Sequence, residues 1–264
     1  IRPPVELFIQ RGANIIIGND GDDILNVTRT TGGAFTITAV GTLVDVDAGA
    51  TQSVSGIEQI NLVGVNAADD TVTINDLTGT GVALVNVNVG TNGTDAVTVN
   101  GTSGNDSVTA VQNGGNVEVT GLAAKVVVSN AEATDSVTFN GLGGNDTLTT
   151  DGTAATVTVA TATTTITGAT TPSLIYGSLE NLSILGGPST NNLAVTGAAN
   201  YTHTPGAAAD AGTVLAETLP ISYTGIASGE TVSLTGASVT ANGTAANDTL
   251  RYRQRASRSP GGPR

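Results

Sequence analysis

The sequence lacks several residue types on which most folds depend. It has no Cys, Met or Trp, and aromatic residues make up only 3% of its 264 residues. Without cysteine, the chain can form neither disulfides nor thiolate metal sites. So few large rings cannot fill the core of an ordinary β-sandwich. No apolar run approaches the roughly 18 residues that a membrane-spanning helix needs, so we expect no membrane insertion.

Charged residues are scarce and unevenly distributed. They form 12% of the chain, against about 25% in average proteins. All 22 acidic residues precede residue 251, where only Arg2, Arg11, Arg29 and Lys125 oppose them, so residues 1–250 carry a net charge of −18. An acidic body repels nucleic acid and anionic lipid and attracts cations. We therefore expect no nucleic-acid partner.

Glycine and β-forming residues are abundant instead. The chain has 35 glycines, and Val and Thr alternate in short segments separated by Gly, Asn, Asp and Ser. Alternation with a period of two indicates half-buried strands, and the spacers are turn residues. The segments recur about every ten residues, and no helical periodicity occurs. The sequence therefore predicts an all-β protein.

A longer repeat underlies this pattern. Residues 94–133 align with residues 134–173 without a gap, and both contain the signature G-x-x-G-N-D before a strand. A 40-residue repeat is too short for a sandwich domain of roughly 100 residues, so it favours a parallel β-solenoid over tandem antiparallel β-sandwich modules. The repeat equals either two turns of about 20 residues or one four-sided turn. The residues predicted inside are Val97, Val108, Val117, Val137, Leu148 and Val157.

The pattern divides the chain into five parts. Residues 1–17 are expected to form N-terminal end strands, 18–197 the repeat solenoid, 198–220 a looped insertion, 221–250 the final repeat strands and 251–264 a basic disordered tail. The insertion is predicted because this segment breaks the rhythm with alanines, two prolines and the only histidine, His203. We expect His203 to be a surface loop residue.

The recurring turn has a physical explanation. Gly supplies the positive φ that a sharp corner requires, and Asn tolerates the same region. Asp can accept hydrogen bonds from the exposed N–H groups of the bend. Stacking should align Asn105 with Asn145, whose amides can form a ladder, and Asp106 with Asp146. Stacked carboxylates repel unless N–H donors or a cation satisfy them.

The turn resembles the hemolysin-type (RTX) calcium-binding nonapeptide G-G-x-G-x-D-x-U-x, which forms a parallel β-roll. The matching positions are Gly18/Gly21/Asp23/Leu25, Gly90/Gly93/Asp95/Val97, Gly101/Gly104/Asp106/Val108 and Gly141/Gly144/Asp146/Leu148, with a weaker copy at Gly243/Asp248/Leu250. The wider style, as in "GIEQINLVG" and "GSLENLSILGG", is similar to bacterial surface proteins with β-strand repeats. The resemblance implies Ca²⁺ between neighbouring coils. The candidate ligands are Asp20, Asp22, Asp23, Asp95, Asp106, Asp135 and Asp146.

The copies depart from the family in one respect. They are isolated or lie in pairs 11 residues apart, whereas calcium takes six to eight oxygens. Capping of turns by these aspartates is therefore the competing interpretation. No cofactor is required by any motif, and Ca²⁺ is the one that the sequence suggests.

Catalytic residues are not expected. The adjacent Asp69 and Asp70 resemble a carboxylate pair, but neighbours in a strand point to opposite faces. The Thr-rich run at 156–167 raises ice binding, although ordinary solvent-facing Thr explains it equally well.

These features together predict a secreted or cell-surface structural or adhesive protein. Its expected partners are other copies of itself, in a filament or surface array, and glycans or a cell surface. The alternatives are a calcium-binding module of a larger secreted effector and a carbohydrate-active β-helix enzyme.

Overall fold

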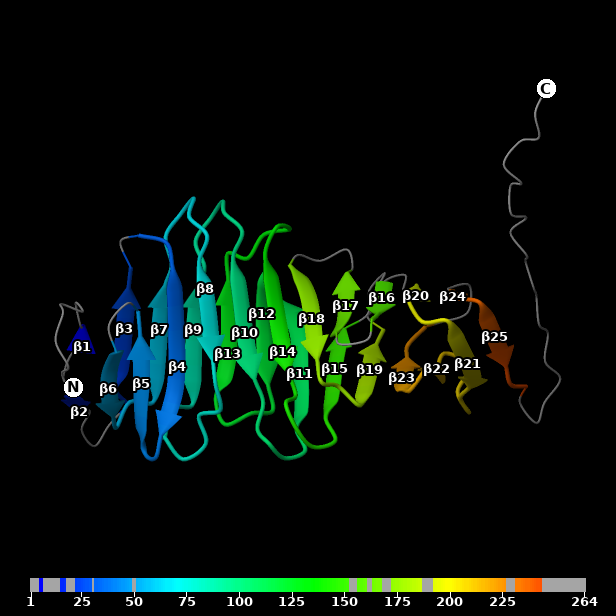
Figure 1. Ribbon diagram of the computed structural model, residues 1–264, viewed down its shortest axis with the longest axis horizontal. Coiled ribbons are helices and arrows are strands. Elements are labelled where there is room, and N and C mark those ends of the chain that lie inside the picture. Colours follow the sequence, from blue (N-terminus) through cyan, green and yellow to red (C-terminus); the bar gives the residue numbers. More distant parts are fainter. Residues whose placement is uncertain are drawn as a thin grey trace, which may run out of the picture.

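The computed structural model describes residues 5–6, 15–17, 22–29, 31–48, 51–151, 156–160, 163–167, 172–186, 192–226 and 231–243. All regular structure in these ranges is β-strand, and none of it is a helix long and apolar enough to cross a bilayer. The strands stack along the long axis of the molecule (Figure 1). The predicted all-β parallel β-solenoid is therefore confirmed, and tandem antiparallel sandwiches are not formed.

The strands form two sheets, which we name sheet A and sheet B. In spatial order, sheet A contains β1 (Val5–Glu6), β3 (Ile24–Thr28), β7 (Gln59–Val63), β9 (Leu84–Asn88), β13 (Lys125–Ser129), β12 (Asn116–Thr120), β11 (Ser107–Asn113), β15 (Thr147–Asp151), β19 (Asn181–Leu185), β23 (Leu219–Thr224), β22 (Gly212–Ala216), β21 (Asn200–Pro205) and β25 (Ser238–Ala241). Its neighbours in space are mostly not neighbours in sequence, as stacking of successive coils requires.

Sheet B has the same character. In spatial order it contains β2 (Ile15–Ile17), β6 (Thr51–Ser55), β5 (Leu43–Asp47), β4 (Ala34–Val40), β8 (Thr71–Ile74), β10 (Ala96–Asn100), β14 (Ser136–Asn140), β18 (Ser173–Gly177), β17 (Thr163–Thr167), β16 (Thr156–Val159), β20 (Leu193–Thr196) and β24 (Val232–Thr235). The chain passes back and forth between the sheets through short arches, so each coil has two sides.

A plain coil places one strand in each sheet. Thr71 of β8 lies opposite Ala96 of β10, and Gln59 of β7 lies opposite Leu84 of β9, so this coil is 25 residues long. Other coils are longer because one of their strands is replaced by a three-stranded antiparallel meander. The longest of these separates Leu84 from its partner Lys125.

Four meanders occur in the described chain, and they alternate between the sheets. β4–β6 lie in sheet B, β11–β13 in sheet A, β16–β18 in sheet B and β21–β23 in sheet A. Every antiparallel strand pair lies inside one of them. Each meander runs backwards along the axis, so its first strand pairs with the following coil and its third strand with the preceding one.

The 40-residue repeat is one such long coil, and neither of the two turn lengths considered above describes it. Its first half stacks in register, with Ala96 opposite Ser136 and Ser107 opposite Thr147. Its second half does not stack, because β12 is the middle of a meander in sheet A whereas β16 belongs to a meander in sheet B.

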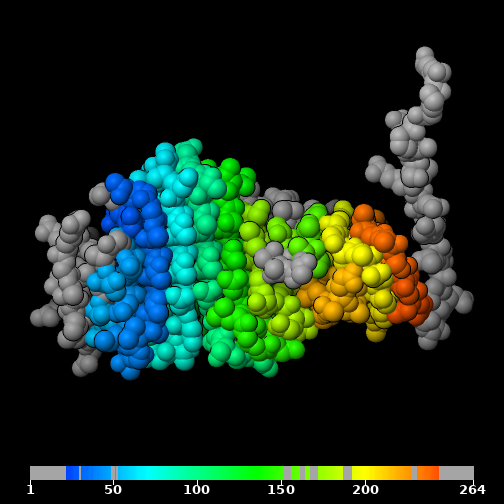
Figure 2. All heavy atoms as spheres, viewed as in Figure 1, coloured from blue at the N-terminus to red at the C-terminus, as the bar shows by residue number. Residues whose placement is uncertain are grey.

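The core is a narrow layer between the two sheets. Inward and outward residues alternate along nearly every strand, as the period of two predicts. All six residues predicted to be inside are buried, with exposed fractions of 3% or less: Val97, Val108, Val117, Val137, Leu148 and Val157. The body narrows from the cyan and green coils to the yellow and orange ones (Figure 2).

Residues 198–220, expected as a looped insertion, instead form β21, β22 and the start of β23. The prediction of a loop was wrong because both prolines occupy positions at which a β-strand tolerates proline. Pro205 ends β21, and Pro220 pairs only with β22, since the register with β19 begins at Ile221. Proline is tolerated where its missing N–H has no partner to bind.

His203 is likewise a strand residue and not a loop residue. It lies in β21, where its Nε2 is 2.7 Å from the Tyr223 hydroxyl and the two rings stack with centroids 6.0 Å apart. Burial lowers the pKa of His203. Residues 1–17 contribute β1 and β2, and the tail at 251–264 lies outside the described residues.

Candidate functional site

Acidic residues end the arches that lead into sheet B, and they form a first acid column of Asp70, Asp95 and Asp135. The main-chain N–H of Asp70 donates to Asp95 Oδ1 (2.7 Å), and the N–H of Asp95 donates to Asp135 Oδ1 (2.8 Å). Within their own arches, Asp70 Oδ2 accepts from the Val65 N–H and Asp135 Oδ2 from the Glu132 N–H. Each carboxylate therefore joins two consecutive coils.

A second acid column ends the arches that lead into sheet A. It contains Asp106, Asp146 and Glu180, and it repeats the same bonds. The Asp106 N–H donates to Asp146 Oδ1 (2.8 Å), and the Asp146 N–H donates to Glu180 Oε2 (2.7 Å). Asp106 Oδ2 also accepts from the Thr102 N–H (2.7 Å) of its own arch.

Glutamate replaces aspartate where the arch is short. Glu58 and Glu180 stand in the "GIEQ" and "GSLEN" sequences, and each directly precedes its strand, β7 or β19. Glu58 Oε2 accepts the Asp23 N–H (2.7 Å), as Glu180 accepts that of Asp146. The longer side chain lets a shorter arch reach the same N–H group. This equivalence explains the second sequence signature.

In three of the arches the first glycine makes room for the carboxylate. A Cβ on Gly101 would lie 2.4 Å from Asp106 Oδ2, and one on Gly141 would lie 2.1 Å from Asp146 Oδ2. Gly64 stands in the same relation to Asp70, at 2.6 Å. No side chain fits at these distances, so glycine is required there for packing.

Asparagine amides form ladders on both sheets. On sheet B, Asn100 Nδ2 donates to Asn75 Oδ1 (2.8 Å) and Asn140 Nδ2 to Asn100 Oδ1 (3.0 Å). At the predicted pair, the bond is a different one: the main-chain N–H of Asn145 donates to Asn105 Oδ1 (2.8 Å). Stacked amides satisfy one another along the axis, which stabilises the register of the coils.

Burial shifts the pKa of two of these aspartates. It raises the pKa of Asp95, against the opposing effect of the hydrogen bond from Asp70. It likewise raises the pKa of Asp146, and the nearby Glu180 and Asp106 carboxylates raise it further. Removing a carboxylate from water disfavours its charged form, which accounts for both directions.

The predicted calcium ligands fall into separate places. Asp95 and Asp135 lie in the first column, whereas Asp106 and Asp146 lie in the second. A five-residue strand, about 17 Å long, separates Asp95 from Asp106. The residues 40 apart in sequence are therefore brought together, and those 11 apart are not.

The remaining candidates lie near β3. Asp22 is exposed, Asp23 directly precedes β3 and donates its main-chain N–H to Glu58 Oε2, and Asp20 lies outside the described residues. Among the residues that the structure describes, no three His, Cys, Asp or Glu side chains converge as a metal site would require. The arrangement does not fit an RTX-type site between tandem turns. Calcium binding stays a prediction.

Asp146 differs from its counterparts in one respect. Its Oδ2 is buried without a hydrogen-bond partner among the described residues, whereas Asp106 Oδ2 binds the Thr102 N–H. In the Asp146 arch the position of Thr102 is taken by Leu142, an exposed residue with φ +72°. Sequence reasoning could not find this difference, because it follows from the conformation of one arch.

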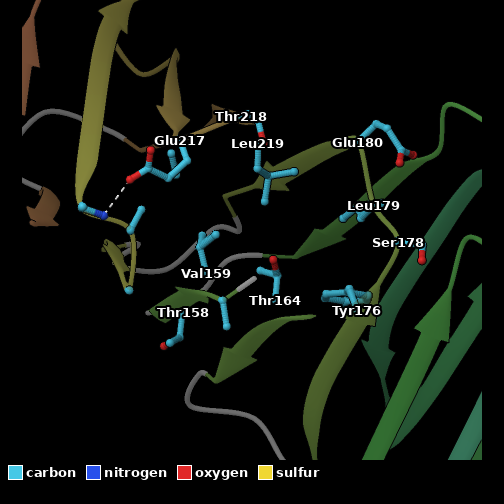
Figure 3. A pocket seen from close by; sticks show the side chains of 15 residues that line it. Thr158, Val159, Thr164, Tyr176, Ser178, Leu179, Glu180, Glu217, Thr218 and Leu219 are labelled. Atoms are coloured by element: carbon cyan, nitrogen blue, oxygen red, sulfur yellow. Dashed lines mark hydrogen bonds between the residues drawn. The ribbon is translucent and has the colours of Figure 1, made fainter. Parts of the chain in front are cut away.

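A hollow of about 940 Å³ opens between the meanders β16–β18 and β21–β23. Figure 3 shows Glu217 and Glu180 at opposite ends of this hollow, with Val159, Thr164 and Leu219 between them. Both carboxylates bind main-chain N–H groups, Glu217 Oε1 those of residues 199 and 200. The two acids therefore do not converge as the carboxylates of a glycosidase do.

The outer face of sheet B is free of charge over a long distance. In the spatial order of sheet B, the nine neighbouring strands β4, β8, β10, β14, β18, β17, β16, β20 and β24 contain no Asp, Glu, Lys or Arg. One continuous outward row across them consists of Thr36, Thr73, Thr98, Thr138, Ile175, Thr165, Thr158, Thr196 and Thr235. The Thr-rich run at 156–167 contributes Thr158 and Thr165 to this row, which the register of the coils creates.

Searches of protein-family models, curated proteins and solved structures found no match to this chain.

Proposed function

We propose that this chain is a secreted or cell-surface structural and adhesive protein that assembles end to end. The observation that carries the proposal is the use of the acidic residues. In both acid columns they accept N–H groups of the adjoining coil. The polar groups thus stabilise stacking of one coil on the next, and the same stacking between molecules produces a fibre, sheath or surface layer.

Adhesion is supported by the uncharged face of sheet B. The body carries a net charge of −18 over residues 1–250, yet no charged residue lies on the nine sheet B strands that run, in spatial order, from β4 to β24. An uncharged surface rich in hydroxyl groups suits neutral glycans, which offer hydroxyls and no charge. Thr98→Glu should weaken binding to a neutral cell-wall polysaccharide, and Thr149→Glu on sheet A should not. Equal binding of both variants would contradict adhesion through this face.

Assembly is tested directly by sedimentation velocity and electron microscopy of the purified chain over a wide range of concentrations. We expect rods that lengthen with concentration, because heterologous contacts that do not close generate filaments. Monomers alone, in both low and high salt, would refute the assembly. Protease accessibility on intact source cells tests the surface location.

A calcium-dependent module is the second candidate. The observation that favours it is the buried, unpartnered Oδ2 of Asp146, which lies in a column with two further carboxylates. A carbohydrate-active enzyme has less support, since the acids of the hollow are held apart. Turnover of acidic polysaccharides by the purified chain would establish it.

A further inference from the structure

Five Asn-Gly peptide bonds occur in the chain, after Asn92, Asn100, Asn113, Asn140 and Asn242. This dipeptide is prone to a spontaneous reaction, because glycine has no Cβ to shield its main-chain nitrogen. The nitrogen attacks the asparagine Cγ, its proton leaves with the side-chain NH2 as ammonia, and a succinimide ring closes. Water then opens the ring at either carbonyl, which gives aspartate or isoaspartate. Ring closure requires rotation of the main chain, so the surrounding structure decides which of these bonds reacts.

Two of the bonds are held by the stacking of the coils. The N–H of Gly101 donates to Asn140 O (2.8 Å), and that of Gly141 donates to Gly177 O (3.1 Å). The side-chain amides belong to the sheet B ladder, in which Asn140 Nδ2 donates to Asn100 Oδ1 (3.0 Å). Rotation at either asparagine breaks bonds to a neighbouring coil, so the structure opposes ring closure at both.

Asn92 is exposed, but its arch is held from both sides. The Asn92 N–H donates to Glu132 Oε1 (3.3 Å), and the Thr134 hydroxyl donates to Gly93 O (3.0 Å), both from the following coil. From the preceding coil, the Ala68 carbonyl oxygen would lie 2.5 Å from a Cβ on Gly93. Close packing between two coils leaves this arch little room to rotate.

Asn113 is placed differently, because it ends β11 at the first hairpin of a meander. It pairs with Asn116, and Gly114 and Gly115 form the turn between them, with φ of 58° and 89°. Asn113 and both glycines are exposed. A Cβ on either glycine would meet no atom within 4 Å, so open space adjoins the turn.

The contacts of Asn113 lie within its own meander. Its Nδ2 donates to Glu118 Oε1 (3.3 Å) in β12. The register of β11 with β15 of the next coil ends at Ala110, before the hairpin begins. Opening the end of this hairpin therefore leaves the stacking of the coils intact, and strand ends of this kind open at a low free-energy cost.

We propose that Asn113 is a modification site, at which the folded chain forms a succinimide with Gly114 and is hydrolysed to aspartate or isoaspartate. The inference is independent of the proposed function. Aspartate at this position would lose the bond from Nδ2 and place a second carboxylate beside Glu118. Isoaspartate adds a carbon atom to the main chain, which no longer fits the two-residue turn. Either product weakens the hairpin between β11 and β12.

Peptide mapping by mass spectrometry tests the site on the purified chain, aged in mildly alkaline buffer. Asn113 should convert about tenfold or more faster than Asn92, Asn100 and Asn140, because one or two further hydrogen bonds must open at those sites. The same chain unfolded in urea is the matched control, and there the four should convert at similar rates. Asn242 borders residues outside the described ranges, so the comparison is among these four.

A variant tests the effect on the meander. Asn113→Gln keeps a side-chain amide but closes a ring far less readily, since its amide carbon is one atom further from the main chain. Ageing should speed hydrogen exchange of the β12 amides in the wild type and not in this variant. Equal acceleration in both would overturn the link between the modification and the hairpin.

The mapping outcomes decide the site. Conversion at Asn113 first, with the preference lost in urea, supports the inference. Equal or faster conversion at Asn92, Asn100 or Asn140 in the folded chain overturns it, as does a folded chain in which none of the four converts while the unfolded chain does. A preference for Asn113 that persists in urea also overturns it, because the local sequence and not the fold would then be the cause.

Discussion

Two glycines of one arch illustrate how differently neighbouring residues are constrained. Gly101 and Gly104 both match the recurring signature. A Cβ on Gly101 would lie 2.4 Å from Asp106 Oδ2, whereas one on Gly104 would meet only the Thr102 hydroxyl, at 3.6 Å. The first glycine is thus required for packing, and the second is not required in its own arch.

The contrast gives a first prediction. Gly141→Ala, which places a Cβ 2.1 Å from Asp146 Oδ2 and 2.4 Å from the Ser178 carbonyl oxygen, should destabilise the chain by about 1–3 kcal/mol through overpacking. Gly104→Ala should leave stability nearly unchanged. Urea unfolding of both variants measures the difference. Similar midpoints for the two would show that the arches adjust more easily than their close contacts indicate.

The second acid column gives a second prediction. Asp106→Ala and Asp146→Ala should each destabilise the chain by about 1 kcal/mol, the magnitude of a lost capping bond. If calcium binds the column, wild-type stability should also rise with calcium concentration, because a ligand of the folded state stabilises it by mass action. Thermal unfolding in chelator and in millimolar calcium distinguishes the two roles. Identical wild-type midpoints would reject the metal.

Burial of the aspartates predicts a pH dependence. Since burial raises the folded-state pKa of Asp95 above its ordinary value, the folded chain holds more protons than the unfolded chain at a pH between the two pKa values, and this contribution to stability is lost as pH rises through the folded-state pKa. Asp95→Asn keeps an oxygen for the Asp70 N–H but cannot titrate. The unfolding midpoint of the variant relative to that of the wild type should therefore rise between pH 4 and pH 7, because only the wild type loses the Asp95 contribution. Parallel pH profiles would contradict this.

Other groups act in the opposite direction. A hydrogen bond with Lys125 lowers the pKa of Glu118, and hydrogen bonds with Asn200 lower that of Glu217, so their contributions are lost as pH falls. Comparing the variant with the wild type removes these shared effects. The test thus reports on Asp95 alone.

At the scale of single residues, the sequence was informative about which residues matter and less so about their partners. The Gly–Asn–Asp signature predicted capping, and capping is what the carboxylates do. It did not predict that their main partners are N–H groups of the adjoining coil, because residues 40 apart become neighbours only through the stacking. The equivalence of Glu58 and Glu180 with the aspartates was hidden by the different arch length.

At the scale of elements, the strands were predictable and the meanders were missed. Alternation of apolar residues is the same in a strand that continues the solenoid and in one that folds back. The signal that distinguishes them is the turn. Gly114 and Gly115, between β11 and β12, have φ of 58° and 89°, as a two-residue hairpin requires. The sequence Asn-Gly-Gly-Asn indicates such a hairpin, and it was the available clue.

This turn gives a prediction for the meander. Gly115→Val should destabilise it by about 1–2 kcal/mol, because a β-branched residue is strained at positive φ. Gly114→Asn should be nearly neutral, since Asn tolerates the left-handed region. Hydrogen exchange of the β12 amides measures the local effect. Faster exchange throughout the chain, and not only in β11–β13, would mean that the meander does not open independently.

At the scale of the whole molecule, charge should govern how filaments associate. In the proposed assembly, the net charge of −18 over residues 1–250 opposes contact between parallel rods. Salt shortens the screening length from about 30 Å at 0.01 M to about 3 Å at 1 M. We therefore expect filaments to bundle as salt or calcium rises, with widths measured by electron microscopy. Constant width at all salt concentrations would contradict this.

The alternation of the meanders bears on the straightness of such rods. Each meander adds two strands to one sheet and none to the other, which lengthens that side by about 10 Å. Two successive meanders on the same side would make the rod curve toward the shorter sheet. Because the four meanders alternate, the sheets end with 13 and 12 strands. The curvature of a rod of this kind therefore depends on the order of its insertions, and balanced insertions let each molecule grow longer without bending.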